Sequence, residues 1–520
     1  MSKNIETAQR IEQAPGVFVH LDHESMKAFA ALAEQTDLQP IEETIISPER
    51  AASSVAGAST GGAAGASDLQ TKGLIRYGAD ILTKLGYSQK SLKNLSFYVQ
   101  TPNPVGGIDV SKEQGYTIAF EDPIDNAGHK KENYDEIVDV ISDKETVKQR
   151  YREMLRTHGK ILDISHFYVS AAIRGIVMEE LSQEEEFKNI NERVIQVTHF
   201  HSSPSFTIRQ ENPEYYKGHR SSWARENYEI ASLRTGITVF STEKERELTA
   251  QAYDGVQGLT YEFIMENSFV SPLTIDTDKP EGSDPIEERK KAREILKLPE
   301  DATVFMMVTR LDTEKGYDAF ILNWINWAQS KIAGLTDQTQ IESIIDQLPY
   351  CVVAGGAPLK DPRLVARYKE VYDFIHSNAV DERIRDRIRI PGPMPGKQVF
   401  PAADVVFGPS LTESYHMVPK EAGAQQIQSH DPSEGMHGVP VFLSDIAAHQ
   451  ETHGDKAFYF DHLSENGFAT AFDAAMDPKL RAHYGRLNAQ NTEQFSVEQS
   501  TETFLTKLDE VLKRKGQSLN

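Results

Sequence analysis

Two segments in the second half of the chain share a pattern in which an apolar strand leads through a polar turn into the start of a helix. They are TVFMMVTRLDTEKGYDAF at 303–320 and DVVFGPSLTESYHMVPKEAGA at 404–424. In an open α/β sheet, ligands bind outside the carboxyl ends of the strands, where such turns lie. The pattern therefore predicts an α/β fold with a binding site built from these two turns.

The turn after the second strand has the features of an anion site flanked by carboxylates. Pro419 suits the first turn of a helix, and the backbone N–H groups before it, together with the helix dipole, favour a phosphate. Glu413 and Glu421, eight positions apart, would accept hydrogen bonds from sugar hydroxyls. In the alternative interpretation, Glu421 only complements the helix dipole and Glu413 is a solvated loop acid.

The turn after the first strand carries two cations, Arg310 and Lys315. A guanidinium and an ammonium can neutralise the charge of a departing diphosphate in place of a metal ion. An isolated pair of this kind would be interpreted as solvent-facing loop charges. Its combination with the acidic turn that follows favours a diphosphate site.

Four motifs follow one another between residues 290 and 460. They are RLDTEKG (Arg310–Gly316), VVAGG (Val352–Gly356), AADVVFGPSLTESYHMVPKEA (Ala402–Ala422) and GVPV (Gly438–Val441). This order resembles the donor-binding half of the retaining GT-B glycosyltransferases, and most closely the sucrose-phosphate synthase and trehalose-phosphate synthase groups. The resemblance implies an α/β fold of the GT-B type, with two Rossmann-like domains that face each other across a cleft.

The resemblance also implies roles for individual residues. Arg310 and Lys315 would contact the donor diphosphate and act in catalysis. Glu421 would bind the ribose, and Glu413 would bind the donor sugar and act in catalysis. The distal phosphate or the sugar would lie against three backbone amides, those of Tyr415, His416 and Met417.

Two segments depart from the pattern of the relatives. Many relatives have Gly or Asn where this chain has His416, so the imidazole would add a contact to the donor sugar or alter the pocket. The identity of the sugar is therefore left open. Relatives also often carry glycines where this chain has Ala447, Ala448 and His449.

A Gly-rich loop at 50–67 precedes a helical pattern at 68–87. Its Gly61–Gly62 pair resembles the glycine loop that lies under the donor phosphates and the acceptor in this superfamily. A flexible loop is an equally simple interpretation. The Gly106–Gly107 pair is a competing candidate, although a plain turn fits that pair better.

A strand expected within 193–206 ends in His199 and His201. The resemblance places a catalytic histidine in the loop after such a strand, and the serines that follow favour His201. Two histidines with one residue between them are also compatible with metal binding. No cysteine or carboxylate cluster stands nearby in the sequence, so we expect no metal site. A hydrogen-bonded loop histidine is the remaining alternative.

A chain of 520 residues exceeds what one hydrophobic core usually supports. The proline- and charge-rich segment at 271–302 is typical of a linker, and its D-T-D at 276–278 fits a turn better than a metal site because no apolar strand precedes it. We predict an acceptor-side Rossmann-like domain at 1–285 and a nucleotide-sugar-binding Rossmann-like domain at 286–490. An amphipathic helix at 491–520 would pack back on the first domain.

Composition limits the partners. A net charge of −23 argues against nucleic acid and anionic membranes, since both attract clustered positive charge. No apolar run reaches the length of about 18 residues that crosses a bilayer, and the N-terminal segment lacks the apolar core of a secretory signal. The single cysteine, Cys351, lies in an apolar strand and suits core packing in the cytosol. We expect a cytoplasmic enzyme, with which a homo-oligomer is compatible.

The implied function is the retaining transfer of a hexose, with glucose expected, from a nucleotide diphosphate sugar to a small soluble acceptor. The acceptor hydroxyl would belong to a sugar, a sugar phosphate or a polyol. No cofactor or metal is required, because Arg310, Lys315 and the helix start before Pro419 meet the charge of the leaving diphosphate. One alternative is a phosphorylase of the same fold that acts on a sugar 1-phosphate. The other is a non-catalytic carbohydrate- or nucleotide-binding protein.

Overall fold

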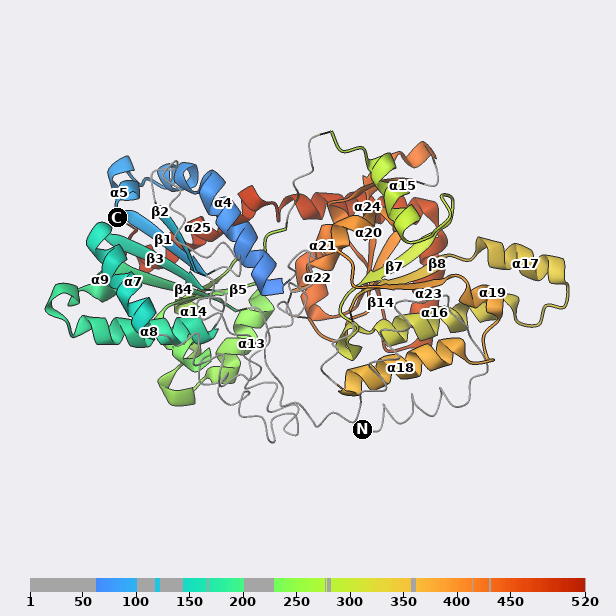
Figure 1. Cartoon of the computed structure of the whole chain (residues 1–520), viewed down its shortest axis with the longest axis horizontal. Coiled ribbons are helices and arrows are strands. Elements are labelled where there is room, and N and C mark those ends of the chain that lie inside the picture. The colour runs from blue at the N-terminus through green and yellow to red at the C-terminus, as the bar shows by residue number, and fades with distance from the viewer. Residues whose placement is uncertain are drawn as a thin grey trace. The chain divides into compact units, whose positions relative to one another are not determined.

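The computed structural model describes residues 62–100, 117–121, 144–165, 168–200, 229–275, 277, 282–356, 362–413, 415–429 and 432–519. They divide into two compact units (Figure 1). One unit spans Thr277–Glu493, and the other combines Thr60–Asp276 with Gln494–Asn520.

The 277–493 unit is built on a six-stranded parallel sheet in the order β14-β13-β10-β7-β8-β9. From β7 the chain adds β8 and β9 on one side, and it then returns to add β10, β13 and β14 on the other. The strand order therefore reverses between β7 and β10, which is the doubly wound arrangement that creates a ligand crevice. The strands are β7 (Val304–Val308), β8 (Tyr350–Ala354), β9 (Ile388–Gly392), β10 (Val405–Gly408), β13 (Val441–Ser444) and β14 (Phe458–Phe460).

Helices cover both faces of this sheet (Figure 1). Within β7, Phe305 and Met307 belong to the core beneath α16, whereas Val304 and Met306 belong to the core beneath α15. Such burial on both faces explains the continuous apolar run of the strand. The helices are α15 (Pro285–Ile295), α16 (Tyr317–Ile332), α17 (Gln338–Gln347), α18 (Pro362–His376), α19 (Glu382–Arg385), α20 (Gly396–Val399), α21 (Val418–Gly423), α22 (Ala447–His453), α23 (Glu465–Met476) and α24 (Pro478–Glu493). A short antiparallel ribbon pairs β11 (Gln426–Gln428) with β12 (Met436–Gly438).

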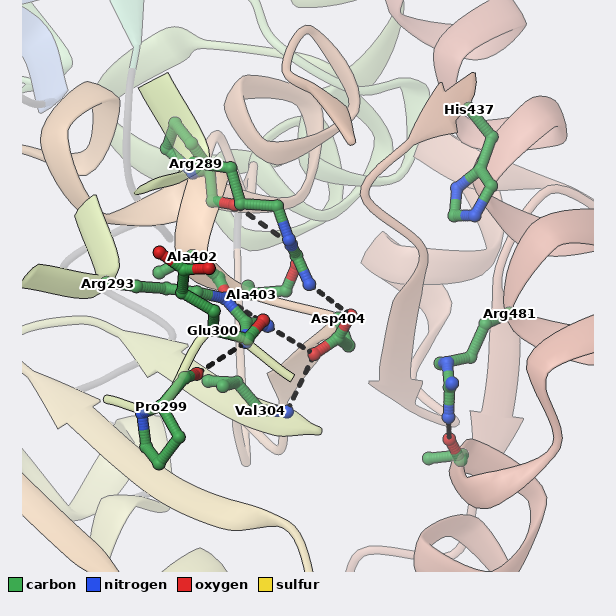
Figure 2. A network of polar contacts seen from close by, with 12 residues as sticks. Arg289, Arg293, Pro299, Glu300, Val304, Ala402, Ala403, Asp404, His437 and Arg481 are labelled. Atoms are coloured by element: carbon green, nitrogen blue, oxygen red, sulfur yellow. Dashed lines mark hydrogen bonds and ion pairs between the residues drawn. The ribbon is translucent and has the colours of Figure 1, made fainter. Parts of the chain in front are cut away.

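Asp404, the residue before β10, is a buried carboxylate that fixes where the two central strands begin (Figure 2). It accepts hydrogen bonds from Arg289 Nη2 at 2.6 Å, from Arg293 Nη2 at 3.0 Å and from the backbone N–H of Val304 at 2.8 Å. Both arginines come from α15. Burial lowers the pKa of Arg293 to about 10 even though Asp404 raises it, so the guanidinium stays charged at neutral pH and has Asp404 as its buried counterion.

We predict that Asp404→Asn destabilises the protein by about 3–5 kcal/mol, because it leaves buried guanidinium charge uncompensated. Urea denaturation at neutral pH measures the change in the free energy of unfolding. Glu510→Gln is a matched control, since it removes an exposed ion pair with Lys507 and should cost less than about 1 kcal/mol. Equal effects of the two substitutions would contradict the role assigned to Asp404.

The other unit also holds a six-stranded parallel sheet, in the order β2-β1-β3-β4-β5-β6. Here the order reverses between β1 and β3. Its strands are β1 (Leu95–Gln100), β2 (Thr117–Glu121), β3 (Lys160–Ser165), β4 (Val194–Phe200), β5 (Ile237–Phe240) and β6 (Ser268–Val270). Its helices are α4 (Gly62–Lys84), α5 (Gln89–Lys93), α7 (Lys144–Thr157), α8 (Tyr168–Ser182), α9 (Ile190–Arg193), α13 (Glu243–Tyr253), α14 (Tyr261–Glu266) and α25 (Val497–Arg514).

The last helix, α25, shares a core with α4. Leu505 and Leu508 of α25 pack in one cluster with Leu74 and Leu82 of α4. Beyond the end of α4, the hydroxyl of Tyr87 donates a hydrogen bond to an oxygen of Asp509 at 2.6 Å. The C-terminal segment is therefore an integral layer of this unit. Among the described helices, none combines the length and apolar character needed to cross a membrane.

Candidate functional site

The candidate site lies where three neighbouring strands of the 277–493 sheet end. β7 leads into the turn with Arg310 and Lys315, β10 leads into the turn with Glu413, and β13 leads into α22, which carries His449. The structure joins the first two turns directly, because Lys315 Nζ lies 2.8 Å from Glu413 Oε2. This ion pair bridges the point at which the strand order reverses.

Backbone contacts hold these two turns together. Gly316 has a φ of +72°, and a Cβ at that position would lie 2.4 Å from the carbonyl oxygen of Pro409. Only glycine fits such an approach without strain. The backbone N–H of Leu411 also donates a hydrogen bond to the carbonyl oxygen of Glu314 at 2.8 Å. The distance between Lys315 and Glu413 is thus set largely by the backbone.

Glu413 is a buried carboxylate, with 6 % of its side chain exposed. Besides the Lys315 ammonium, it accepts a hydrogen bond from the hydroxyl of Ser410 at 2.8 Å. Burial would raise its pKa, but the charge that His416 gains in acid and the Lys315 ammonium lower that pKa to about 2. Glu413 is therefore an acceptor of hydrogen bonds at neutral pH, and the interpretation of this residue as a solvated loop acid is wrong.

His416 lies beside this carboxylate, with Nε2 at 3.8 Å from Glu413 Oε1. Its other ring nitrogen, Nδ1, is 2.9 Å from His449 Nε2, and the two rings are stacked with centroids 5.1 Å apart. Gly408 makes room for the ring, because a Cβ there would lie 2.8 Å from His416 Cε1. Burial lowers the pKa of His416 to about 3 and that of His449 to about 4, although Glu413 raises both.

Lys420 is a component of this site that the sequence analysis missed. Its side chain is fully buried, its Nζ lies 4.1 Å from the ring centroid of Tyr415, and burial lowers its pKa to about 7. A lysine between proline and glutamate in a first helical turn normally indicates an exposed position. Only the tertiary packing of the short helix α21 reveals that it is enclosed.

The structure places the other predicted residues as follows. Arg310 is 47 % exposed and lies 4.0 Å from a carboxylate oxygen of Asp312. Tyr415 is buried, Met417 precedes the first residue of α21, and Glu421 lies in the first turn of that helix. Gly62 is the first residue of α4, whereas Gly61, His201 and the Gly106–Gly107 pair lie outside the described residues. His199, which was the less favoured of two histidines, is buried at the end of β4 with Nε2 at 3.1 Å from Gln70 Nε2.

Glu413, His416 and His449 could each offer one atom to a metal ion, and these atoms lie within 4.8 Å of one another. The geometry favours a hydrogen-bonded network over a metal centre. A cation would have to break the contact between the two histidines and displace the Lys315 ammonium from Glu413. The expectation that catalysis requires no metal stays a prediction.

The low pKa values of the two buried histidines predict how the free energy of unfolding changes in acid. The unfolded chain protonates each ring below about pH 6.5, whereas His416 and His449 in the folded protein resist protonation until about pH 3 and 4. Because the unfolded state binds more protons in this interval, the free energy of unfolding should fall as pH is lowered from 6.5 to 4. Each ring contributes a slope of up to about 1.4 kcal/mol per pH unit.

Urea denaturation at a series of pH values measures this slope. The variant His449→Gln should lose part of the dependence on pH, while the exposed His483→Gln should keep all of it. A wild-type stability that is constant between pH 6.5 and 4 would contradict the neutral, buried state of both rings.

Comparison with known proteins gives a likeness in structure only. Neither a protein-family model nor a curated sequence matches this chain. A sucrose-phosphate synthase from Thermosynechococcus elongatus superposes with a TM-score of 0.52 at 14 % identity, over 85 % of this chain and 93 % of that one. A UDP-forming α,α-trehalose-phosphate synthase from Burkholderia xenovorans gives 0.53 at 13 % identity, over 80 % of this chain and 99 % of that one.

A third similar structure is a trehalose-6-phosphate synthase studied for glycosyl transfer with retention. It gives a TM-score of 0.51 at 14 % identity, over 80 % of this chain and 93 % of that one. At such identities the likeness concerns the fold. The chain has the two-domain α/β fold of these GT-B glycosyltransferases, as the order of its motifs predicted.

Proposed function

We propose that this chain is a retaining glycosyltransferase that moves a hexose from a nucleotide diphosphate sugar to a hydroxyl of a small acceptor. Glucose is the proposed hexose, and a sugar phosphate is the first acceptor class to test. The fold supports this proposal, since the similar structures named above are sucrose- and trehalose-phosphate synthases. We assign the donor to the 277–493 unit and the acceptor to the other.

One observation carries the proposal, namely the ion pair between Lys315 and Glu413 at the reversal of strand order. In doubly wound sheets this position is the ligand crevice. The pair places a cation that suits a diphosphate next to a carboxylate that suits hydroxyl groups. A nucleotide diphosphate sugar presents both groups side by side.

The charges of the site suit the departure of a diphosphate. Arg310 is half-exposed and only loosely paired with Asp312, so its guanidinium is available to a ligand. Together with Lys315 it would meet the negative charge that develops on the leaving phosphate. We assign the ribose to Glu421 and the distal phosphate or the sugar to the amides of Tyr415, His416 and Met417.

In the proposed reaction, the bond between the anomeric carbon and the phosphate oxygen breaks as the acceptor oxygen attacks on the same face. The departing phosphate oxygen takes the proton of the acceptor hydroxyl, so the charge on the leaving group is neutralised as it forms. No covalent glycosyl-enzyme intermediate is needed, and no metal ion is invoked. His201, Gly61 and Gly62 are the residues proposed to contribute from the other unit.

Thermal denaturation of the full chain tests the proposal. The melting temperature is measured with a panel of nucleoside diphosphates, nucleotide sugars and sugar 1-phosphates. A ligand that binds the folded state raises the melting temperature, so a shift with one nucleotide class is expected and would name the donor. A shift with a sugar 1-phosphate alone would contradict the transferase and support a phosphorylase.

A substitution at Lys315 tests the assignment of the diphosphate. We predict that Lys315→Ala lowers kcat for transfer about 10²–10³-fold, which is the usual effect of losing one group that stabilises developing charge. Lys369→Ala is the control, since it removes a lysine from an exposed ion pair of the same unit and should leave kcat unchanged. Circular dichroism verifies that both variants are folded. Wild-type kcat in a folded Lys315→Ala protein would exclude this role.

A further inference from the structure

A chain of hydrogen bonds fixes which nitrogen of His449 carries a proton. The hydroxyl of Ser444 lies 2.7 Å from the carbonyl oxygen of Ser410. Because a carbonyl oxygen only accepts, the hydroxyl donates its proton to this hydrogen bond. Nδ1 of His449 lies 2.9 Å from the carbonyl oxygen of Ser444 and 3.1 Å from its hydroxyl oxygen. Both oxygens can therefore only accept, and Nδ1 of His449 must be the donor.

The same logic then determines the state of His416. A neutral His449 with its proton on Nδ1 presents a lone pair on Nε2. Since this atom lies 2.9 Å from Nδ1 of His416, His416 donates from Nδ1. Burial keeps both imidazoles neutral near pH 7 by lowering each pKa. Nε2 of His416 is consequently an unprotonated acceptor.

This bare nitrogen faces a second acceptor. Oε1 of Glu413 lies 3.8 Å from it, which is too far for a hydrogen bond,. Glu413 is ionised at neutral pH, since its pKa is about 2, and it accepts from Ser410 and Lys315, so it has no proton to offer. Within the described part of the chain, the polar contacts of the His416 ring are the hydrogen bond at Nδ1 and this longer approach at Nε2. Two neighbouring acceptors would repel a phosphate, but they suit the hydroxyl groups of a sugar.

We propose that Nε2 of His416 and Oε1 of Glu413 together accept hydrogen bonds from hydroxyl groups of the transferred sugar, with His449 and Ser444 fixing the tautomer that this requires. The inference rests on the proposed glycosyltransferase function and adds what the site recognises. His416 becomes a residue that determines donor specificity, and His449 becomes a positioning residue that acts through it.

The physical basis of selectivity is the cost of unpaired buried acceptors. A site built to bind a hydroxyl strongly rejects the analogue that lacks it, because its own polar groups are then left without partners. Such a loss costs about 10- to 100-fold in affinity for each unpaired group. Binding of the nucleoside diphosphate alone should not depend on the His416 side chain, since this ligand carries no hexose and its phosphate would meet only the backbone amide of this residue.

Isothermal titration calorimetry of the full chain tests the recognition of the sugar. The ligands are the nucleotide sugar found by thermal denaturation, its singly deoxygenated analogues and the nucleoside diphosphate. His416→Phe keeps an aromatic ring without the acceptor, and His483→Phe is the exposed control. We expect His416→Phe to lower the affinity for the nucleotide sugar about 10- to 100-fold. The affinity for the nucleoside diphosphate should stay unchanged.

One deoxy analogue should bind the wild-type protein as weakly as the complete donor binds the His416→Phe variant. When this analogue is tested with the variant, the affinity should be little lower than after either change alone. His416→Gln, whose amide oxygen can accept, should recover part of the affinity. The substitution His416→Phe could instead lower the affinity for every deoxy analogue by the same factor as for the complete donor. In that case His416 does not contact the sugar, and the inference is wrong. If neither nucleotides nor nucleotide sugars bind at all, the proposed function itself is wrong.

The tautomer has a readout that needs no ligand. In ¹⁵N-histidine-labelled protein near pH 7, NMR should show Nδ1 of His416 protonated and Nε2 bare. His449→Leu removes the acceptor for the Nδ1–H of His416, so the proton of His416 should shift toward Nε2. The affinity for the nucleotide sugar should then fall, whereas the affinity for the nucleoside diphosphate should stay unchanged. Wild-type His416 protonated on Nε2 would overturn the inference even if nucleotide sugars bind.

Discussion

The reversal of strand order between β7 and β10 is the constraint on which the candidate site depends. Neighbouring strands at such a point send their following turns in opposite directions, so a crevice opens at the sheet edge. Here the turns remain in contact across it through Gly316 and Pro409. Lys315 and Glu413, almost one hundred positions apart in the chain, meet only because of this topology.

The site concentrates ionisable groups in a buried region, and their arrangement explains how the fold tolerates them. Glu413 is compensated by an ammonium and a hydroxyl, whereas His416 and His449 avoid the cost of buried charge by remaining neutral,. Lys420 lies over an aromatic ring, whose negative face attracts a cation,. Glu413, His416 and His449 are thus each held in one protonation state near pH 7, which makes the direction of the hydrogen bonds among them definite.

The fold and the two turns of the site could be predicted because their signals are local. An apolar run, a turn and a helix start identify the ends of β7 and β10, and the order of the motifs identified the GT-B fold. The pairing of His416 with His449 could not be predicted, since it joins the ends of two different strands. Burial of Lys420 and the convergence of two arginines on Asp404 are likewise products of tertiary packing.

The contact of Gly316 with Pro409 has a consequence for how the site can diversify. Because backbone atoms set the spacing of the turns, a side chain on one turn can be exchanged without displacing the other. The cationic part can thus stay constant while position 416 changes. In the proposed glycosyltransferase, such modularity would let a lineage acquire a new donor preference through one or two substitutions, with the leaving-group chemistry untouched.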